Sequence, residues 1–318
     1  MKRLLALLTL SLVGWSAYAQ LIAPDASKYK VSVAPMLTTR WSQSSPFNGM
    51  CPKGVDSKGD SVRCPVGCVA LALAQIMKYY DYPLTGQGSK TYKPLLSKTE
   101  LSADFGATTY DWTHMKDSYL SFGSYRNYSA DDSIAVATLC YQIGVSVGMM
   151  YSPSGSSAFA YGNITHDLVD NFRYSSDSIR YLLRSDYTKA EWMDLIFNEL
   201  SAGRPIFYAG NSPTQGGHAW VLDGYDAEGK VHINWGWRGS GNDYYDIDLT
   251  DSSNDFYNNQ SMIIGIKPPI TNGINRVTTD DKAHVRIYGP DGRMRNNLQK
   301  GINLIRLEDG TVKKVILK

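Results

Sequence analysis

The sequence predicts an α+β fold in which helices come first along the chain and strands follow. Segments with the apolar periodicity of helices occur up to about residue 201, whereas short apolar runs typical of strands dominate residues 205–267. The chain has 318 residues, of which 43% are apolar, and a formal net charge of +2. This composition excludes disordered and collagenous proteins and nucleic-acid binders with a strongly basic face.

The amino-terminal residues 1–19 are predicted to be a secretory signal peptide. Two basic residues precede the nearly continuous apolar run 4–13, and small residues then occupy both positions of a cleavage site before Gln20. The apolar run is shorter than the ~20 residues that span a bilayer, and no later segment is long enough, so no membrane span is expected. The mature protein is expected outside the cell or on the outer-membrane surface, in an oxidising environment.

Four helices are predicted in the first part of the chain. Residues 67–80 are apolar on all sides, so this helix should be buried, and Pro83 follows its end. The other three helices are predicted over residues 133–143, 165–171 and 189–201. Thr188 and Glu191 form a capping-box pattern at the start of the last one.

Strands dominate the remainder, which divides into two pieces. Five strands are predicted over residues 205–209, 219–225, 230–235, 244–249 and 261–267, and three more over 283–288, 302–307 and 312–317. Residues 20–269 hold 20 Lys and Arg against 25 Asp and Glu, whereas residues 270–318 hold 10 against 5. Pro268-Pro269 marks the junction, so residues 20–269 and 270–318 are predicted to be separate domains.

Cys68 is the first candidate catalytic residue, because it opens the apolar helix directly after Pro65-Val66-Gly67. A thiol at a helix amino terminus lies where unpaired N–H groups and the helix dipole favour an anion, which lowers its pKa. The backbone N–H of Cys68 is also free to stabilise a developing oxyanion. The alternative interpretation is a small apolar core residue, the usual role of a lone cysteine.

His218 is the candidate base, since the Gly216-Gly217 pair before it lets a substrate backbone approach closely and an apolar strand follows. Asn234, in the next strand, is the candidate that orients the imidazole. A three-residue loop ending at Gly229 places Asn234 on the same sheet face as His218, whereas a two-residue loop places Trp235 there. A bulge or a shifted turn is also required, because parity alone leaves the pair offset along the strands.

These residues resemble the streptopain family of cysteine peptidases. The segment from Gly67 to Tyr79 resembles the family's active-site helix, and Gly216 to Ala219 and Asn234 to Trp237 resemble its His and Asn-Trp motifs. The resemblance covers about residues 33–269 and is greatest to secreted members from Bacteroides- and Prevotella-like bacteria. It implies a papain-like fold and a monomeric endopeptidase for protein or peptide substrates, without cofactor or metal.

The resemblance also implies a role for each site residue. Cys68 as thiolate attacks the scissile carbonyl, paired with His218 as imidazolium, and Asn234 accepts a hydrogen bond from the imidazole. Trp235 shields that hydrogen bond from water. The Gln43 side chain is the candidate for the second oxyanion donor beside the Cys68 N–H, and the alternative is that Gln43 is an ordinary surface amide. Substrate contacts are expected from Gly217, Ser157 and Trp237, with a hydrophobic substrate residue two positions before the cut.

The remaining cysteines suggest a disulfide. Cys51 and Cys64 flank a polar stretch, and in an exported protein they are predicted to pair. A zinc site from Cys51, Cys64, Cys68 and a histidine is the alternative, but its spacings fit no common zinc pattern and it would remove the nucleophile. Pairing of Cys68 with Cys51 or Cys64 would instead give a redox-silenced enzyme. Cys140 is expected to be buried in its helix.

The two ends of the chain carry further expectations. Streptopain has a long inhibitory propeptide, whereas only residues 20–33 precede the family match here, too few for a folded inhibitory domain. A separate inhibitor protein, or no latency, is therefore expected. Residues 270–318 resemble the end of carboxy-terminal sorting domains of Bacteroidetes type IX secretion, and the alternatives are a strand appendage of the catalytic domain or a decayed remnant.

Two other classes of function stay open. A non-catalytic binding protein such as an adhesin is one, although the intact Cys68, His218 and Asn234 argue against it. Another papain-like chemistry is the second, either acyl transfer or cleavage of cell-wall peptides. Turnover of muropeptides without turnover of protein would favour this other papain-like chemistry over a protein-cleaving peptidase.

Overall fold

The computed structural model describes residues 21–94, 100–123, 125–250, 253–269, 286–295, 299–306 and 312–317. The chain divides into two compact units at Pro268 and Pro269. The first unit mixes helices and strands, as the sequence predicts, and the second is a small sheet. The predicted signal peptide and the residues that join the two units lie outside the described part.

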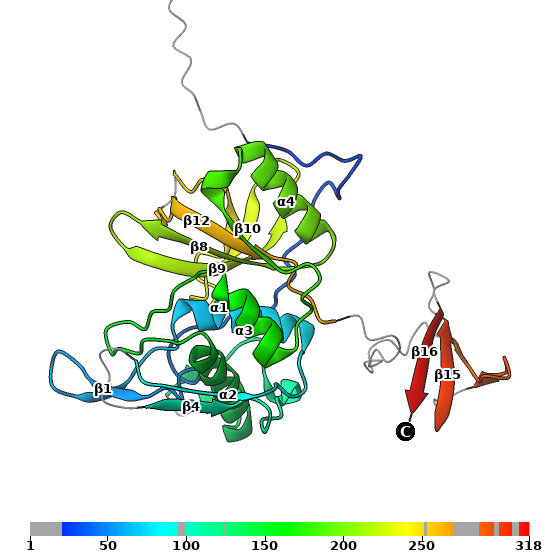
Figure 1. Ribbon diagram of the computed structural model, residues 1–318, viewed down its shortest axis with the longest axis horizontal. Coiled ribbons are helices and arrows are strands. Elements are labelled where there is room, and N and C mark those ends of the chain that lie inside the picture. Colours follow the sequence, from blue (N-terminus) through cyan, green and yellow to red (C-terminus); the bar gives the residue numbers. More distant parts are fainter. Residues whose placement is uncertain are drawn as a thin grey trace, which may run out of the picture. The chain divides into compact units, whose positions relative to one another are not determined.

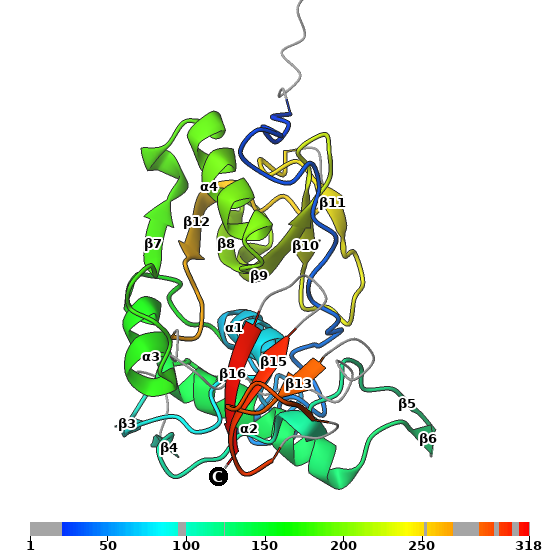
Figure 2. The ribbon, with the colours of Figure 1, turned by 90° about the vertical axis from the view of Figure 1, so that its right-hand side faces the viewer.

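The first unit is built on a six-stranded antiparallel sheet with the order β11-β10-β9-β8-β12-β7 (Figures 1 and 2). Its strands are β7 (Arg180–Leu183), β8 (Ile206–Ser212), β9 (Gly216–Tyr225), β10 (Val231–Asn234), β11 (Asp243–Tyr245) and β12 (Asn258–Ile264). All five strands predicted here are present, and β7 is an additional edge strand. β11 ends earlier than predicted, and Ile247 and Leu249 are buried beyond its end.

The four predicted helices are confirmed as α1 (Cys68–Tyr80), α2 (Ala130–Ser146), α3 (Asn163–Phe172) and α4 (Lys189–Ser201). Two short 3-10 helices occur at Trp112–His114 and Arg184–Asp186. The predicted capping box of Thr188 and Glu191 is present at α4, and α2 starts earlier than predicted because Ser129 and Asp132 form another capping box. A capping box satisfies two orphan donors at the helix start.

The sheet separates two apolar cores, with α4 on one face and α1 on the other (Figure 1). Alternation along β9 assigns Trp220 and Leu222 to the α4 core and Ala219 and Val221 to the α1 core. Residues 69–77 of α1 are all buried, as its apolar sequence predicts. Packing in the two cores therefore fixes the position of β9 relative to α1, the helix that begins at Cys68.

Three two-stranded hairpins that the sequence pattern does not predict also belong to the first unit. They are β1 (Lys53–Val55) with β2 (Ser61–Arg63), β3 (Ser89–Tyr92) with β4 (Leu101–Asp104), and β5 (Ser121–Phe122) with β6 (Tyr125–Arg126). Most of them are short and half exposed, so they lack the apolar alternation that reveals a strand in a sequence.

The predicted disulfide between Cys51 and Cys64 is wrong for this structure, in which all four cysteines are free thiols. The backbone N–H of Cys64 donates to the carbonyl of Pro52 at 3.0 Å, so Cys64 lies opposite Pro52 and Cys51 is one residue out of register. Both thiols are buried. In the part of the chain that the structure describes, no three His, Cys, Asp or Glu residues are grouped to hold a metal ion.

The second unit is an antiparallel sheet with the order β14-β13-β15-β16. Its strands are β13 (Arg286–Tyr288), β14 (Met294–Arg295), β15 (Gly301–Arg306) and β16 (Val312–Leu317). The three strands predicted here are present within the described residues, and β14 is additional. Over the described residues of both units, none of the helices combines the length and the apolar character that a membrane crossing requires.

Candidate active site

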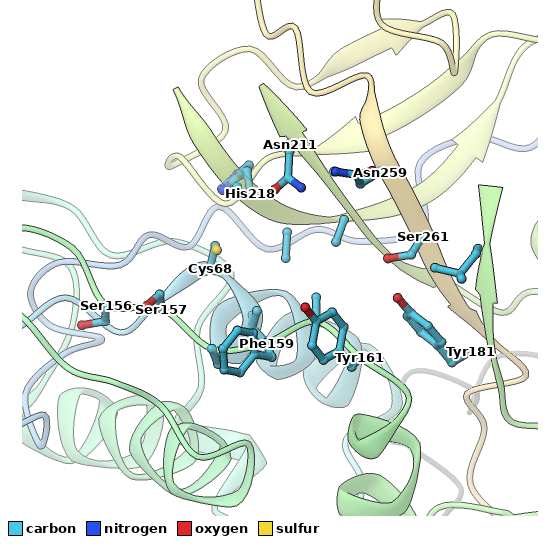
Figure 3. Close-up of a pocket in the computed structure, with 18 residues that line it drawn as sticks. Cys68, Ser156, Ser157, Phe159, Tyr161, Tyr181, Asn211, His218, Asn259 and Ser261 are labelled. Carbon is cyan, nitrogen blue, oxygen red and sulfur yellow. The ribbon is translucent and has the colours of Figure 1, made fainter. Parts of the chain in front are cut away.

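A cleft of about 440 Å³ opens where the amino end of α1 meets the sheet (Figure 3). Its walls come from Cys68 and Val69 of α1, from the loop 156–161, and from β7, β8, β9 and β12. The predicted nucleophile Cys68 and the predicted base His218 both line it, as do Gly217 and Ser157. No Asp, Glu, Lys or Arg is among the described residues that line this cleft.

The backbone before Cys68 is held tightly. Gly67, the residue before α1, has a φ of 89°, and a Cβ there would lie 2.5 Å from the sulfur of Met149. The left-handed backbone conformation therefore requires glycine here, and a Cβ would in addition displace the Met149 side chain. The Val66 N–H donates to the Gln43 carbonyl at 2.9 Å, and the Ser156 hydroxyl donates to the Pro65 carbonyl at 2.6 Å. These bonds fix where α1 begins and where the thiol lies.

Burial raises the pKa of the Cys68 thiol, although the backbone N–H groups of Ala219, Val69 and Cys68 itself stabilise the thiolate. The N–H groups of the helix terminus thus act in the predicted direction, but the net pKa is raised and not lowered, contrary to the prediction. The loss of hydration of a buried anion outweighs the attraction of the three N–H groups.

His218 lies within an aromatic cage and is only 8% exposed. Its ring centroid is 5.0 to 6.0 Å from those of Trp237, Phe256, Trp220 and Trp235. Burial in this apolar environment lowers the pKa of His218 to about 4. The described residues give Nε2 one partner, the main-chain carbonyl oxygen of Trp235 at 3.0 Å, which leaves Nδ1 for the thiol. Figure 3 shows His218 on the strand that faces Cys68.

The predicted hydrogen bond from His218 to the Asn234 side chain is wrong. The hairpin starts with the expected parity, pairing His232 with Gly224, but the register shifts between His232 and Ile233, so that Asn234 pairs with Val221. Asn234 therefore faces the α1 core, on the sheet face opposite His218. The sequence predicts a bulge that corrects the offset of the two residues along the strands. A bulge that inserts one residue, however, also moves the side chain of every later position to the opposite face of the sheet.

The main-chain carbonyl of Trp235 takes the place of the Asn234 amide as the partner of His218. The peptide units before and after Trp235 are each held by a hydrogen bond. The Trp235 N–H donates to Oδ1 of Asn242, and the next N–H, that of Gly236, donates to Oδ1 of Asn234, both at 3.1 Å. Gly236 has a φ of 75° and its Cβ position lies 2.8 Å from Leu71 of α1, so this turn also requires glycine. Trp235 is buried, and its own ring shields the imidazole.

A chain of hydrogen bonds joins this turn to α1. Nδ2 of Asn234 donates to the Thr39 carbonyl at 2.9 Å, and the Thr39 hydroxyl donates to Oε1 of Gln75 on α1 at 2.8 Å. All three side chains are buried. The helix that carries Cys68 and the turn that holds His218 are thus positioned by one network. Sequence reasoning missed Thr39, Gln75 and Asn242, and a buried amide within the apolar sequence of α1 was the one available signal.

The other predicted residues lie around this centre. Gly217 and Ser157 are exposed and line the cleft. Trp237 is half-buried, stacks on His218 with centroids 5.0 Å apart, and is not among the residues that line the cleft. Gln43 is half-buried, and its backbone lies beside the loop before Cys68.

Comparison with known proteins identifies the family. The model of the Peptidase C10 family matches residues 41–245, which include Cys68, His218 and Asn234. The chain belongs to the peptidase C10 family. It is 32% identical over 249 residues to streptopain from Streptococcus pyogenes, covering 72% of this chain and 60% of streptopain. It is also 32% identical over 255 residues to the thiol protease/hemagglutinin PrtT of Porphyromonas gingivalis, covering 74% of this chain and 28% of that protein.

Solved structures of C10 peptidases share the fold. Active interpain A, a cysteine protease of Prevotella intermedia, matches with a TM-score of 0.68 and 41% identity over 76% of this chain and 98% of that one. A prointerpain A fragment matches with a TM-score of 0.68 and 40% identity over 79% and 77% of the two chains. The resemblance to the streptopain family and the papain-like α+β fold are therefore confirmed. The chain spans about 60% of the length of the streptopain that it matches.

Alkylation of Cys68 by iodoacetamide in the substrate-free protein should be slow at neutral pH and accelerate towards alkaline pH. The thiolate is the reactive form, and burial raises the pKa of this thiol. The rate is measured by mass spectrometry of the Cys68 peptide from about pH 5 to about pH 10, a range around the ordinary thiol pKa. Buried Cys140 in the same digest is the internal control for unfolding. A rate that stays high and constant down to the acid end would contradict the raised pKa.

Proposed function

We propose that this protein is a secreted cysteine endopeptidase that hydrolyses peptide bonds with Cys68 and His218. The observation that carries the proposal is one arrangement in a cleft. A thiol at the amino end of a buried helix lies across from an imidazole whose Nε2 contacts a fixed main-chain carbonyl. Membership of the C10 family, and similarity to proteins named as cysteine proteases, support the same chemistry.

The reaction begins when the proton of Cys68 moves to Nδ1 of His218, which gives the thiolate–imidazolium pair. Sγ then forms a bond to the scissile carbonyl carbon, while the Cys68 N–H and the Gln43 side chain stabilise the oxyanion. His218 donates its proton to the leaving amine as the C–N bond breaks, and water hydrolyses the acyl-enzyme. The Trp235 carbonyl accepts from Nε2–H throughout, which stabilises the imidazolium and fixes its orientation.

Thiol-dependent turnover of casein tests this function. An epoxide inhibitor specific for cysteine peptidases should abolish the turnover by modifying Cys68, which peptide mapping would detect. Turnover that persists without thiol or after such modification would contradict the assignment. Cleavage of muropeptides in the absence of casein cleavage would point instead to a cell-wall substrate.

Replacement of either catalytic residue should remove nearly all activity. Cys68→Ala and His218→Ala should each lower kcat by roughly 10⁴-fold or more, and the double variant should be no worse, because members of one catalytic unit act non-additively. Turnover of a fluorogenic peptide is the measurement, with circular dichroism to verify folding. His166→Ala is the matched control, because His166 is exposed and does not line the cleft. Clear turnover by Cys68→Ala above a mock preparation would exclude Cys68 as the nucleophile.

Asn234→Ala should lower kcat by about 10- to 1000-fold without abolishing turnover, because Asn234 positions the Trp235–Gly236 peptide and does not react. Asn242→Ala, which removes the acceptor of the Trp235 N–H, should act in the same direction. Asn198→Ala, at an exposed amide of α4, is the matched control. If Asn234→Ala has the kinetics of the unaltered protein, then the Trp235 carbonyl is held without this side chain.

We further propose that residues 1–19 direct export, that residues 20–269 form the catalytic part, and that residues 270–318 are a detachable sorting segment. The separation of two compact units at Pro268 and Pro269 and their opposite charge balance support this division.

A chain that ends at Pro269 should keep its turnover of a peptide substrate after purification but accumulate in a different place in its native host. Specific activity and the distribution between cells, surface and medium are the measurements, with the full chain as control. Lost activity with unaffected export would show that residues 270–318 belong to the catalytic fold.

A further inference from the structure

The floor of the cleft is a row of four side chains, one from each of four neighbouring strands. Ala219 of β9 pairs with Ala209 of β8, Ala209 with Ser261 of β12, and Ser261 with Leu183 of β7. Paired residues of antiparallel strands point to the same face, so the four side chains lie side by side. At about 4.8 Å per strand, the row runs roughly 14 Å from Ala219, whose N–H contacts the Cys68 thiol, to the sheet edge.

Aromatic side chains form the wall opposite this floor. Phe159 and Tyr161, from the loop before α3, stack with ring centroids 5.3 Å apart and ring planes 12° from parallel. They are 61% and 58% exposed, and both line the cleft. Because three of the four floor side chains, those of Ala219, Ala209 and Ser261, are small, a planar apolar group fits between the floor and this wall.

Three hydroxyl groups converge at the far end of the row. Ser261 is 4% exposed as a residue, and its side chain lines the cleft. Tyr181 lies on the same sheet face as Leu183, two residues away along β7. Figure 3 shows the hydroxyls of Ser261, Tyr181 and Tyr161 directed into the same end of the cleft. Hydroxyl groups that line a cleft can donate and accept hydrogen bonds, so this end is suited to a ligand group that can form a hydrogen bond.

The charge of the side chains that line the cleft further restricts which ligand group can bind there. The described residues lining the cleft include no Asp, Glu, Lys or Arg, so a charged side chain would lose hydration without gaining an opposite charge. The fitting group is neutral, has a flat apolar body and has a polar tip. Among the side chains of proteins, tyrosine meets these three conditions best.

The direction of this row of side chains also indicates which substrate residue can reach its far end. It runs from β9 towards β7, away from the β10 side, where Trp235 and Trp237 flank the imidazole that protonates the leaving amine. It therefore faces the acyl part of the substrate. Ser261 lies two strand spacings, roughly 10 Å, from Ala219. The substrate residue that carries the scissile carbonyl lies next to the Cys68 thiol. A substrate side chain that reaches Ser261 therefore belongs to the residue one position earlier, which is two positions before the cleaved bond.

We propose that this cleft end is a subsite for tyrosine two positions before the cleaved bond, with Ser261 and Tyr181 binding the tyrosine hydroxyl. The proposal rests on the proposed peptidase function. It predicts a discrimination that a purely apolar pocket does not provide, namely tyrosine over phenylalanine. A site that hydrogen-bonds a substrate hydroxyl leaves its own polar groups unpaired when that hydroxyl is missing.

The test is a series of fluorogenic peptides that differ only at the residue two positions before the cut, which is Tyr, Phe, Leu, Lys or Glu. We expect kcat/KM to be about tenfold higher for Tyr than for Phe, and lowest for Lys and Glu. Ser261→Ala and Tyr181→Phe should each bring the Tyr-to-Phe ratio towards one. Tyr257→Phe is the control, because Tyr257 carries a hydroxyl near the start of β12 but does not line the cleft, and it should keep the ratio.

Binding separates this proposal from the peptidase function. Titration calorimetry with Cys68→Ala measures the affinities for the Tyr and Phe peptides without turnover, and the Tyr peptide should bind about tenfold more tightly. If every peptide is cleaved but Phe equals or exceeds Tyr, the subsite proposal is overturned and the peptidase function stands. If none is cleaved, a Tyr preference in binding supports the subsite while the peptidase function fails, and equal binding overturns both.

Discussion

The hydrogen bond between Nε2 of His218 and the Trp235 carbonyl is the interaction on which the rest of the site depends. A main-chain acceptor cannot be adjusted by a rotamer, so its direction is set by the backbone on either side of it. That backbone is held by Asn242, by Asn234 and by a glycine turn packed against α1. The site therefore obtains its acceptor from the fold, and the amide that resembles a catalytic residue supports the backbone.

Burial has two opposing effects at this centre. The aromatic cage excludes water from the His218–Trp235 hydrogen bond and so strengthens it. The same cage lowers the pKa of His218 to about 4, below the ordinary value of about 6.5. Between these values the unfolded chain binds the proton and the folded chain does not, so this group makes folding less favourable as pH falls through that window. The cage thus costs stability in acid and gives the imidazole a defined position.

The segment from Val33 to Trp41 ties the two cores together. Val33 pairs with Tyr225 and belongs to the α4 core, whereas Trp41 belongs to the α1 core. Between them, the N–H of Leu37 donates to the fully buried carboxylate of Asp223, the residue at which the hairpin bulges, and the Thr39 carbonyl accepts from Asn234. The bulge that reverses the parity of the hairpin is therefore stabilised by a segment almost 190 residues away in sequence.

The sequence alone determined the helices, the main strands, Cys68 and His218, because apolar periodicity, glycine turns and a cysteine at a helix start depend on near neighbours in the chain. It could not determine the partner of His218, because one bulge residue changes which side chains share a face, and that bulge depends on Asp223 and on the distant segment at Leu37. The hydroxyls of Ser261 and Tyr181 meet only when β12 pairs with β7. Local pattern indicated Cys68 and His218 as the proposed reacting groups, whereas long-range pairing decided which main-chain and side-chain groups lie around them.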